Sequence, residues 1–260
     1  MRNGITDFLG FMLRVGRSYD PVVPLLSDAL AEMRDPGVLD CCSGAGGPWS
    51  ELYDKLDLAH PGIRVQLCDY FPNDEARRSF NARFLGRAEY LARPVDARDI
   101  PPDLPGFRTF FSSFHHFGPG DARRILQDAA AKQTGIGIFE VSQRSGLAVL
   151  WMLLVPVVVW IVTPFLRPFS WKRLAFTYLI PVIPLVIAWD GLASCLRTYS
   201  CDELRSLSES VRGNYQWHIG ELKGPVSPVP VTFLIGLPKS AEIRGIHDRD
   251  RDRRVSTETG

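Results

Sequence analysis

The feature that most constrains this chain is a short apolar run that breaks directly into a turn of small residues. Residues 38–42 (VLDCC) have the composition of a buried strand, and residues 43–47 (SGAGG) follow as a glycine-rich turn. Residues 48–58 then show apolar side chains at helical spacing. A strand, a glycine turn and a helix in this order place the turn at the carboxyl edge of a parallel sheet, where α/β proteins bind nucleotides.

The rest of the chain alternates between strand and helix patterns, which predicts a parallel sheet with helices on both faces, an α/β Rossmann-like fold. Further strands are expected at residues 63–69, 90–94, 107–114, 136–141, 215–220 and 229–237, and helices at 21–34, 73–86, 120–132, 190–197 and 200–212. Asp7 and Arg14 interrupt the N-terminal apolar residues, so no signal peptide is expected. Residues 241–260 alternate charges without an apolar face, which predicts a disordered charged tail.

Charge and cysteine content argue against several classes of protein. The formal net charge is +1, so the sequence shows no excess of basic residues for binding nucleic acid. The five cysteines are too few and too scattered for a disulfide framework. Cys41 and Cys42 are adjacent, but no second pair stands at metal-ligand spacing, so no metal site is expected. A reducing cytoplasm is the compartment that fits this cysteine usage.

Four segments resemble the motifs of the class I S-adenosylmethionine-dependent methyltransferases. They are residues 38–47, Asp69 with Tyr70 and Phe71, residues 95–101 (VDARDIP) and residues 112–117 (SSFHHF). The resemblance covers residues 36–141, and residues 198–238 match the two closing strands of the family more loosely. It implies S-adenosyl-L-methionine as the cofactor and a Rossmann-like methyltransferase sheet as the fold.

The resemblance also implies roles for individual residues. Gly44 and Gly46 would pass under the methionine portion of the cofactor, Asp40 would help hold its amine, Asp69 would bind the ribose and Asp96 would reach the adenine. The cofactor-binding residues carried over in this way are Asp40, Ser43, Gly44, Ala45, Gly46, Asp69, Tyr70, Asp96, Ala97 and Ser112. One departure is Cys42, which stands where many members of the family have the first glycine.

A dinucleotide-binding enzyme is the natural competitor. Its turn has the pattern G-x-G-x-x-G, so that a pyrophosphate can approach the N-terminus of the helix. Gly44 and Gly46 satisfy the first part of this pattern, but the third glycine position is Trp49. A bulky side chain there disfavours close packing around a diphosphate. The methyl donor carries no phosphate, so the sequence favours the methyltransferase.

His115 and His116 follow the fourth expected strand, at the edge of the sheet where the cofactor would lie. One of them is a candidate catalytic base, because an imidazole titrates near neutral pH. The alternative is a packing pair that shapes the methionine site, since methyl transfer often needs only orientation of donor and acceptor. Glu140 is expected to form a salt bridge with Arg144 rather than orient a substrate. Asp190 is expected to cap a helix rather than bind substrate.

Two long apolar segments interrupt the α/β pattern. Residues 145–166 and 174–189 contain no charged side chain, and residues 167–173 (RPFSWKR) join them. The first is long enough to span a bilayer, which takes about 20 apolar residues. The second is shorter and contains Pro181 and Pro184. A buried core helix, a lid over the active site or a dimer surface are alternatives, although a domain of this size cannot easily surround so long an apolar helix.

These segments, residues 145–189, are here called the apolar hairpin, and they favour membrane association. Two full crossings would carry Arg167, Lys172 and Arg173 to the far side of the membrane, against the tendency of basic residues to stay on the cytoplasmic side. A shallow re-entrant or interfacial hairpin avoids this. Its tryptophans are typical of a membrane interface, and they are Trp151, Trp160, Trp171 and Trp189.

The sequence therefore predicts four segments: residues 1–144 as the cofactor-binding part of a methyltransferase domain, 145–189 as the membrane-associated hairpin, 190–240 as the rest of the domain, and 241–260 as the tail. The expected function is methyl transfer from S-adenosylmethionine at the cytoplasmic face of a membrane, to a lipid-like or apolar small-molecule acceptor. The alternative is a membrane-bound sensor or scaffold that binds the cofactor without turnover.

Overall fold

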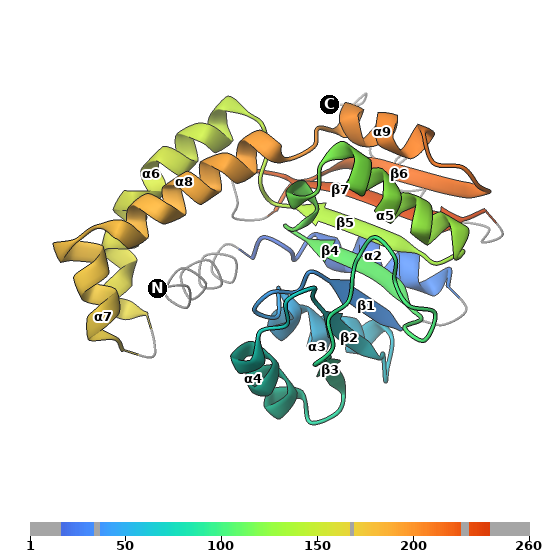
Figure 1. The fold of residues 1–260 in the computed structure, drawn as a ribbon, viewed down its shortest axis with the longest axis horizontal. Helices are drawn as coiled ribbons and strands as arrows, with labels where there is room; N and C mark the ends of the chain where they lie inside the picture. Colours follow the sequence, from blue (N-terminus) through green and yellow to red (C-terminus); the bar gives the residue numbers. More distant parts are fainter. Residues whose placement is uncertain (1–16, 34–36, 167–168, 225–228, 240–260) are drawn as a thin grey trace, which may run out of the picture.

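A computed structural model of the chain describes residues 17–33, 37–166, 169–224 and 229–239. Two predictions concern residues outside the described ranges: that the N-terminus is no signal peptide, and that residues 241–260 form a disordered tail. Arg167 also lies outside these ranges. The described part contains a seven-stranded sheet in the order β3-β2-β1-β4-β5-β7-β6 (Figure 1). The strands are β1 (Val38–Cys41), β2 (Val65–Cys68), β3 (Ala88–Tyr90), β4 (Phe107–Phe111), β5 (Ile136–Glu140), β6 (Tyr215–Leu222) and β7 (Val231–Pro238). The predicted α/β Rossmann-like fold is confirmed.

The strand order reverses between β1 and β4. From β1 the chain runs outward through β2 and β3, and then returns to place β4 on the other side of β1. The strands β1 to β5 are parallel, and β7 alone runs antiparallel to its two neighbours, β5 and β6. Ligands of open α/β sheets bind where the strand order reverses in this way. The glycine turn after β1 and the histidines after β4 therefore lie at the same edge.

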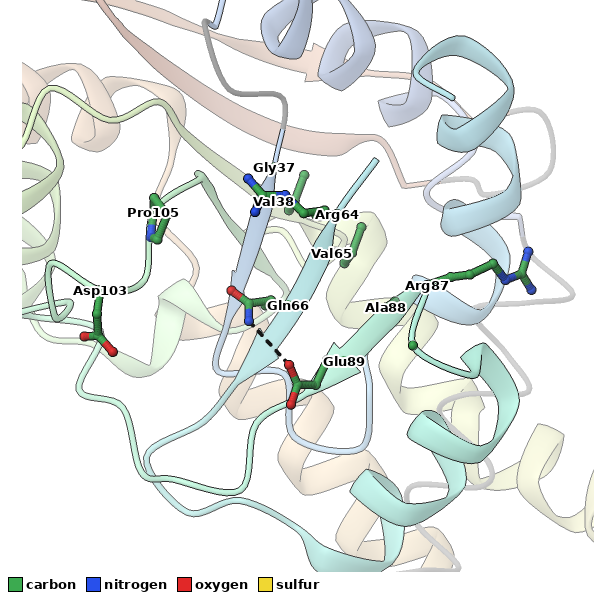
Figure 2. Close-up of a pocket in the computed structure, with 11 residues that line it drawn as sticks. Gly37, Val38, Arg64, Val65, Gln66, Arg87, Ala88, Glu89, Asp103 and Pro105 are labelled. Carbon is green, nitrogen blue, oxygen red and sulfur yellow. Dashed lines mark hydrogen bonds between the residues drawn. The ribbon is translucent and has the colours of Figure 1, made fainter. Parts of the chain in front are cut away.

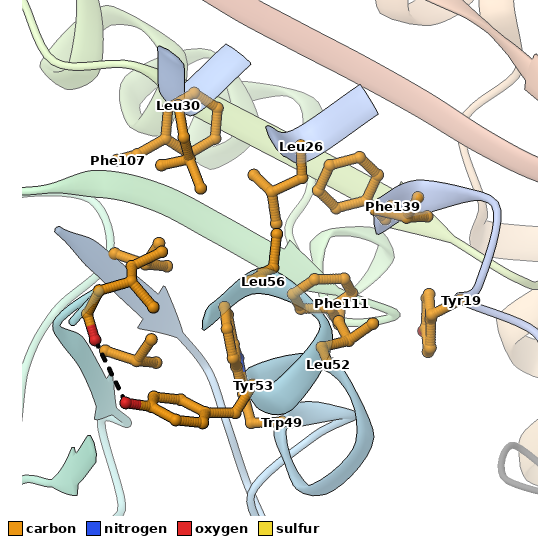
Figure 3. Close-up of a cluster of buried hydrophobic side chains, with 14 of the residues drawn as sticks. Tyr19, Leu26, Leu30, Trp49, Leu52, Tyr53, Leu56, Phe107, Phe111 and Phe139 are labelled. Carbon is orange, nitrogen blue, oxygen red and sulfur yellow. Dashed lines mark hydrogen bonds between the residues drawn. The ribbon is translucent and has the colours of Figure 1, made fainter. Parts of the chain in front are cut away.

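Helices cover both faces of the sheet. On one face, α2 (Val22–Ala31) and α3 (Trp49–Ala59) pack with α4 (Asp74–Phe84), which lies beside β3. On the other face lie α5 (Pro119–Ala131) and α9 (Cys201–Glu209). Figure 3 shows leucines of α2 and α3 against the phenylalanine rings of β4 and β5. The core thus consists of apolar side chains at helical spacing on these helices and of aromatic side chains on the strands. This core supports the edge of the sheet at which β1 and β4 end.

The apolar hairpin follows β5 as two long helices that pack side by side (Figure 1). They are α6 (Gly146–Val162) and α8 (Val182–Arg197), joined through the 3-10 turn η2 (Thr163–Phe165), the short helix α7 (Trp171–Leu174) and the π-helical turn η3 (Ala175–Leu179). Buried contacts between the helices come from Val155 and Val159 of α6 and from Ile183 and Ile187 of α8. Most other large apolar side chains of the hairpin are exposed.

The helix α8 continues through residues 189 and 190, where a new helix was expected to begin. Asp190 therefore lies in the middle of a helix, and its expected role as a helix cap is wrong. Tertiary packing explains the difference, because Gly191 lies directly against α6. A Cβ atom at Gly191 would come within 2.5 Å of Met152 Sδ, so glycine lets the two helices pack here without displacing the Met152 side chain.

Candidate cofactor and acceptor site

The glycine turn is held in backbone conformations that favour glycine. Gly44 and Gly46 have φ angles of 54° and 105°, and Cys42 also lies in the left-handed region, with φ of 59°. Few side chains adopt this conformation without strain, which explains why glycine is common at the position of Cys42 in the family that the motif resembles. A Cβ atom at Gly44 would meet no atom within 4 Å, so this part of the turn faces open space.

Asp69 connects the end of β2 to the glycine turn. Its Oδ2 accepts a hydrogen bond from the N–H of Gly44 at 2.9 Å, and its Oδ1 accepts one from the N–H of Phe71 at 2.8 Å. Tyr70 and Phe71 are exposed beside it, with their rings 4.8 Å apart. The structure thus brings Asp69 and Tyr70 to the open side of the turn, as the sequence predicts for a ligand that lies across β1 and β2.

Asp40 lies beneath the turn and is closed off from solvent. Its Oδ2 accepts the hydroxyl hydrogen bond of Ser43 at 2.5 Å, and its Oδ1 accepts that of Thr109 on β4 at 2.7 Å. Burial raises the pKa of Asp40 to about 6, while the hydrogen bonds from both hydroxyls oppose the shift. These hydrogen bonds of Asp40 connect the turn to β1 and β4. The contact of Asp40 with a cofactor amine stays a prediction.

Asp96 lies in the loop after β3 and is paired with a neighbouring residue. The guanidinium of Arg98 donates to its Oδ1 at 2.9 Å and to its Oδ2 at 2.8 Å, and it also reaches Asp121 at 3.3 Å. The charge and hydrogen bonds of Arg98 hold the pKa of Asp96 below its usual range. Ala97 beside it is buried. The expected contact of this segment with adenine remains untested by the structure.

Ser112, at the end of β4, takes part in a hydrogen-bond network that the sequence did not reveal. Its Oγ accepts the hydroxyl hydrogen bond of Tyr19 at 2.7 Å and the N–H of Val141 at 3.3 Å. The residue has φ of 44°, and Tyr19 is buried against the ring of Phe111. The hydroxyl therefore ties the start of the described chain to the ends of β4 and β5. No local pattern predicts a partner that lies so far away in sequence.

His115 forms a buried pair with Glu140. His115 lies in the 3-10 turn η1 (Phe114–His116) that follows β4, and Glu140 is the last residue of the neighbouring strand β5. Glu140 Oε2 lies 2.7 Å from His115 Nδ1, and its Oε1 accepts the N–H groups of Phe114 at 2.8 Å and His115 at 3.2 Å. The side chains of His115 and Glu140 are only 4% and 5% exposed.

The salt bridge expected between Glu140 and Arg144 is wrong. Arg144 instead pairs with Glu203 of α9, at 3.0 Å. The reason is the pairing of β4 with β5, which points the carboxylate of Glu140 at the backbone of η1. Arg144 lies beyond the end of the strand and reaches outward.

Two buried polar atoms at this site have no hydrogen-bond partner among the described residues. They are His115 Nε2 and Ser113 Oγ. His116 packs on His115 with ring centroids 4.3 Å apart and is itself exposed. Partial burial and then the neighbouring His115 lower the pKa of His116. Buried polar atoms are nearly always paired in proteins, so these two point to a ligand. A histidine whose Nδ1 is held by a carboxylate and whose Nε2 is open is also the arrangement of a general base.

A cavity in the described part of the chain lies at the opposite edge of the sheet. It has a volume of about 360 Å³ and is lined by Val38, Val65 and Ala88, the first residues of β1, β2 and β3 (Figure 2). The amide of Gln66 donates to Glu89 across it, at 3.5 Å. None of the expected site residues lines this cavity. Within the described ranges, no group of three or more His, Cys, Asp or Glu side chains is placed to hold a metal ion.

No family model matches the chain, and no curated protein matches it in sequence. Solved structures do resemble it. The mitomycin 7-O-methyltransferase MmcR is 18% identical with a TM-score of 0.46, covering 84% of this chain and 54% of its own. An O-methyltransferase family protein from Burkholderia thailandensis is 18% identical with a TM-score of 0.45, covering 89% and 58%. The chain thus spans little more than half the length of these two proteins.

A third structure, described as a Zn-dependent alcohol dehydrogenase from Rhodobacter sphaeroides, is 14% identical with a TM-score of 0.50, covering 90% of this chain and 97% of its own. Identities this low bear on the fold alone. The sheet order, in which the antiparallel β7 lies between β5 and β6, is the deciding observation. The fold is that of the class I methyltransferases. In this fold the glycine turn, Asp69 and the β4–η1 loop all lie at the carboxyl edge of the sheet.

Proposed function

We propose that the chain is an S-adenosylmethionine-dependent methyltransferase that acts at a membrane on a lipid-like or apolar small-molecule acceptor. The observation that carries the proposal is the buried His115–Glu140 pair, with its open Nε2, at the same edge of the sheet as the glycine turn. A nucleotide-binding edge and a candidate base thus come together. Buried ring nitrogens are usually paired in proteins, so the unpaired Nε2 supports the binding of a ligand or water at this site.

The residues at the turn fit the methyl donor better than a dinucleotide. Gly44 faces open space beside the partly exposed carboxylate of Asp69, which suits a ribose. Trp49, at the third glycine position of the dinucleotide pattern, is completely buried against Phe111. Its indole therefore fills the space in which a dinucleotide fold packs its helix closely against the strand. S-adenosylmethionine needs no phosphate site there.

The chain's own part in the reaction follows from the geometry. The bound cofactor supplies an electrophilic methyl group on a sulfonium. Glu140 holds the proton of His115 on Nδ1, which leaves Nε2 free to accept the proton of an acceptor hydroxyl or amine. S-adenosylmethionine, held at the glycine turn and Asp69, would supply the methyl group to that oxygen or nitrogen. The carboxylate of Glu140 stabilises the imidazolium that results, as in other carboxylate–histidine pairs.

An apolar acceptor is supported by the position of the hairpin. The helix α8 contacts η1, and the charges of Asp190 and Arg197 act on the pKa of His116. The base of the apolar hairpin therefore lies beside the candidate catalytic histidines. An acceptor that leaves the lipid along the hairpin would arrive beside His116.

Replacing Asp69 by alanine is expected to weaken S-adenosylmethionine binding by about 1.5–3 kcal/mol, because a charged hydrogen bond to the ribose is lost. Isothermal titration calorimetry measures this directly. Asp74→Ala is the matched control, since Asp74 is an exposed carboxylate on α4 that pairs only with Arg77 in the described contacts. Unchanged affinity in the Asp69 variant, or tight binding of NAD by the intact protein, would contradict the assignment. A thermal unfolding curve shows whether the loss of the Gly44 contact alone has disturbed the turn.

The whole proposal is tested by incubating the purified protein with methyl-labelled S-adenosylmethionine and a membrane lipid extract. Label is expected in the lipid-soluble fraction, and Asp69→Ala should abolish most of it. The alternative function, a membrane-bound sensor or scaffold, predicts cofactor binding with no label transferred to any fraction.

A further inference from the structure

We infer that the apolar hairpin enters only one leaflet of a lipid bilayer, so that its tip does not reach the far side. The inference rests on the proposed action at a membrane and adds the depth and orientation of the hairpin. The tip is defined as residues 163–166 and 169–180, the described residues between α6 and α8. Three features of the hairpin carry the argument: its exposed apolar surface, the hydrogen bonding of its tip, and the position of its charges.

The apolar surface surrounds the hairpin on several sides. Residues 146–165 have a mean hydropathy of 2.5 over the most apolar window, yet only 22% of that window is buried. On α6 the large exposed apolar side chains follow helical spacing, and they are Leu147, Leu150, Leu153, Leu154, Val157, Trp160 and Ile161. On α8, Leu185 and Trp189, which precede Asp190, are exposed 63% and 74%. A core helix of a soluble protein would bury such side chains.

The tip is exposed in the same way. Phe165, Trp171 and Leu179 are exposed 74%, 77% and 83%, and Phe169 and Ile180 more than half. A second copy of the chain would cover one side of the hairpin and leave the others in water. Lipid surrounds an inserted segment on all sides, so a bilayer is the occupant that this distribution fits.

Several polar groups at and beside the tip form hydrogen bonds within the hairpin. Arg173 is buried and donates to the carbonyl of Leu166 at 2.6 Å, and the indole N–H of Trp160 donates to the carbonyl of Thr177 at 3.1 Å. The hydroxyl of Thr163 donates to the carbonyl of Val159 at 2.7 Å. Irregular backbone enters lipid only where protein groups satisfy its hydrogen bonds. At the tip, where η2 and η3 interrupt regular helix, Arg173 and Trp160 bond the carbonyls of Leu166 and Thr177. The hydroxyl of Thr177 is buried and has no hydrogen-bond partner among the described residues.

The charges of α8 limit the depth. Asp190 and Arg197 are exposed, and the contact of Gly191 with Met152 places this half of α8 beside the first half of α6. Only residues 182–189 separate Asp190 from the bend at Pro181, which is about 12 Å of helix at 1.5 Å per residue. The hydrocarbon of a bilayer is about 30 Å thick. With Asp190 in water, the hairpin therefore ends within one leaflet.

Beyond the bend the chain turns sideways. The segment Trp171–Leu179 makes an angle of 76° with α8, so it does not extend the hairpin further in the direction of α8. Lys172 at its start is exposed, and its long side chain can reach the head groups from within one leaflet. A sideways segment with tryptophan and lysine is typical of an interfacial anchor.

The first test is binding to vesicles of phosphatidylcholine with a fraction of phosphatidylglycerol, measured by co-sedimentation. The double variant Leu154→Asp with Trp189→Asp is expected to bind at least tenfold more weakly than the intact chain. Leu58→Asp is the matched control, because Leu58 is an 86% exposed leucine on α3 outside the hairpin. Intact protein that ignores vesicles, or that forms a dimer which the double variant breaks, overturns the inference.

The second test measures whether the tip reaches the far side. Cysteine is placed at the tip by Ser170→Cys or, in a second variant, Leu179→Cys, in a chain that carries Cys42→Ser and Cys201→Ser. These proteins bind from outside to vesicles that enclose a membrane-impermeant maleimide. No labelling above the parent chain is expected until detergent opens the vesicles. Labelling of either position in sealed vesicles overturns the single-leaflet arrangement.

Failure of this inference can be told apart from failure of the proposed function. Calorimetry with S-adenosylmethionine on the intact chain, which keeps Cys42, reports cofactor binding independently of the membrane. A chain that binds the methyl donor but crosses the bilayer, or ignores it, loses only the inference about the hairpin.

Discussion

Replacing His115 by alanine is expected to lower the rate of methyl transfer by about 100-fold or more, while the affinity for S-adenosylmethionine stays unchanged. The reason is the loss of a buried imidazole whose Nδ1 is held by Glu140 and whose Nε2 has no hydrogen-bond partner among the described residues. Single-turnover kinetics with the acceptor found in the lipid extract measure the rate, and calorimetry measures the affinity. His60→Ala is the matched control, since His60 lies at the end of α3 and contacts Ser27 on the core side.

Glu140→Gln tests the contribution of the carboxylate to the His115–Glu140 pair. The amide keeps the shape of the carboxylate but cannot stabilise an imidazolium, so the rate is expected to fall by about tenfold or more with cofactor binding retained. His116→Ala should lower the rate less, because its nitrogens accept no hydrogen bond from the described chain and its ring is exposed. Near-normal turnover in both the His115 and the Glu140 variants would show that the pair only shapes the site and that transfer proceeds by proximity.

Removing the hairpin is expected to convert a membrane-bound protein into a soluble one that still binds S-adenosylmethionine. The structure shows where to cut. The hydroxyl groups of Ser142 and Thr198 lie 2.7 Å apart, and Arg144 donates to the carbonyl of Thr198 at 3.2 Å. Residues 144 and 198 therefore lie close enough to be joined by a few glycine and serine residues in place of 145–197. The glycine turn, Asp69 and the His115–Glu140 pair all lie outside the removed segment.

A second variant, in which a linker replaces only the expected hairpin of residues 145–189, is the instructive comparison. It leaves the second half of α8 without its partner helix and uncovers Cys195, which is buried beside Ala148 and Val229. This variant should unfold at a lower temperature than the longer deletion. Fractionation of cell extracts without detergent measures solubility, and calorimetry measures cofactor binding. Intact protein found wholly in the soluble fraction would make the hairpin a lid or a dimer surface.

The sequence by itself determined the features that depend on neighbouring residues. Residues 38–47 predict a buried strand and a glycine turn because apolar side chains and glycines act locally, and the structure has both there. Asp69 ends a strand, so its place at the carboxyl edge follows from the parallel sheet. The absence of charge over residues 145–166 is likewise visible without a fold. The helices and strands of the α/β part were placed within a few residues for the same reason.

Only the tertiary structure decided which side chains meet. Glu140 was expected to pair with Arg144, four residues along the chain, whereas the pairing of β4 with β5 brings it to His115, 25 residues away. Tyr19 reaches Ser112 across 93 residues, and no local pattern marks either partner. The continuity of α8 through Asp190 depends on Gly191 packing against Met152. Periodicity reports the environment of each segment, but the partners of a buried polar group depend on how strands and helices are stacked in space.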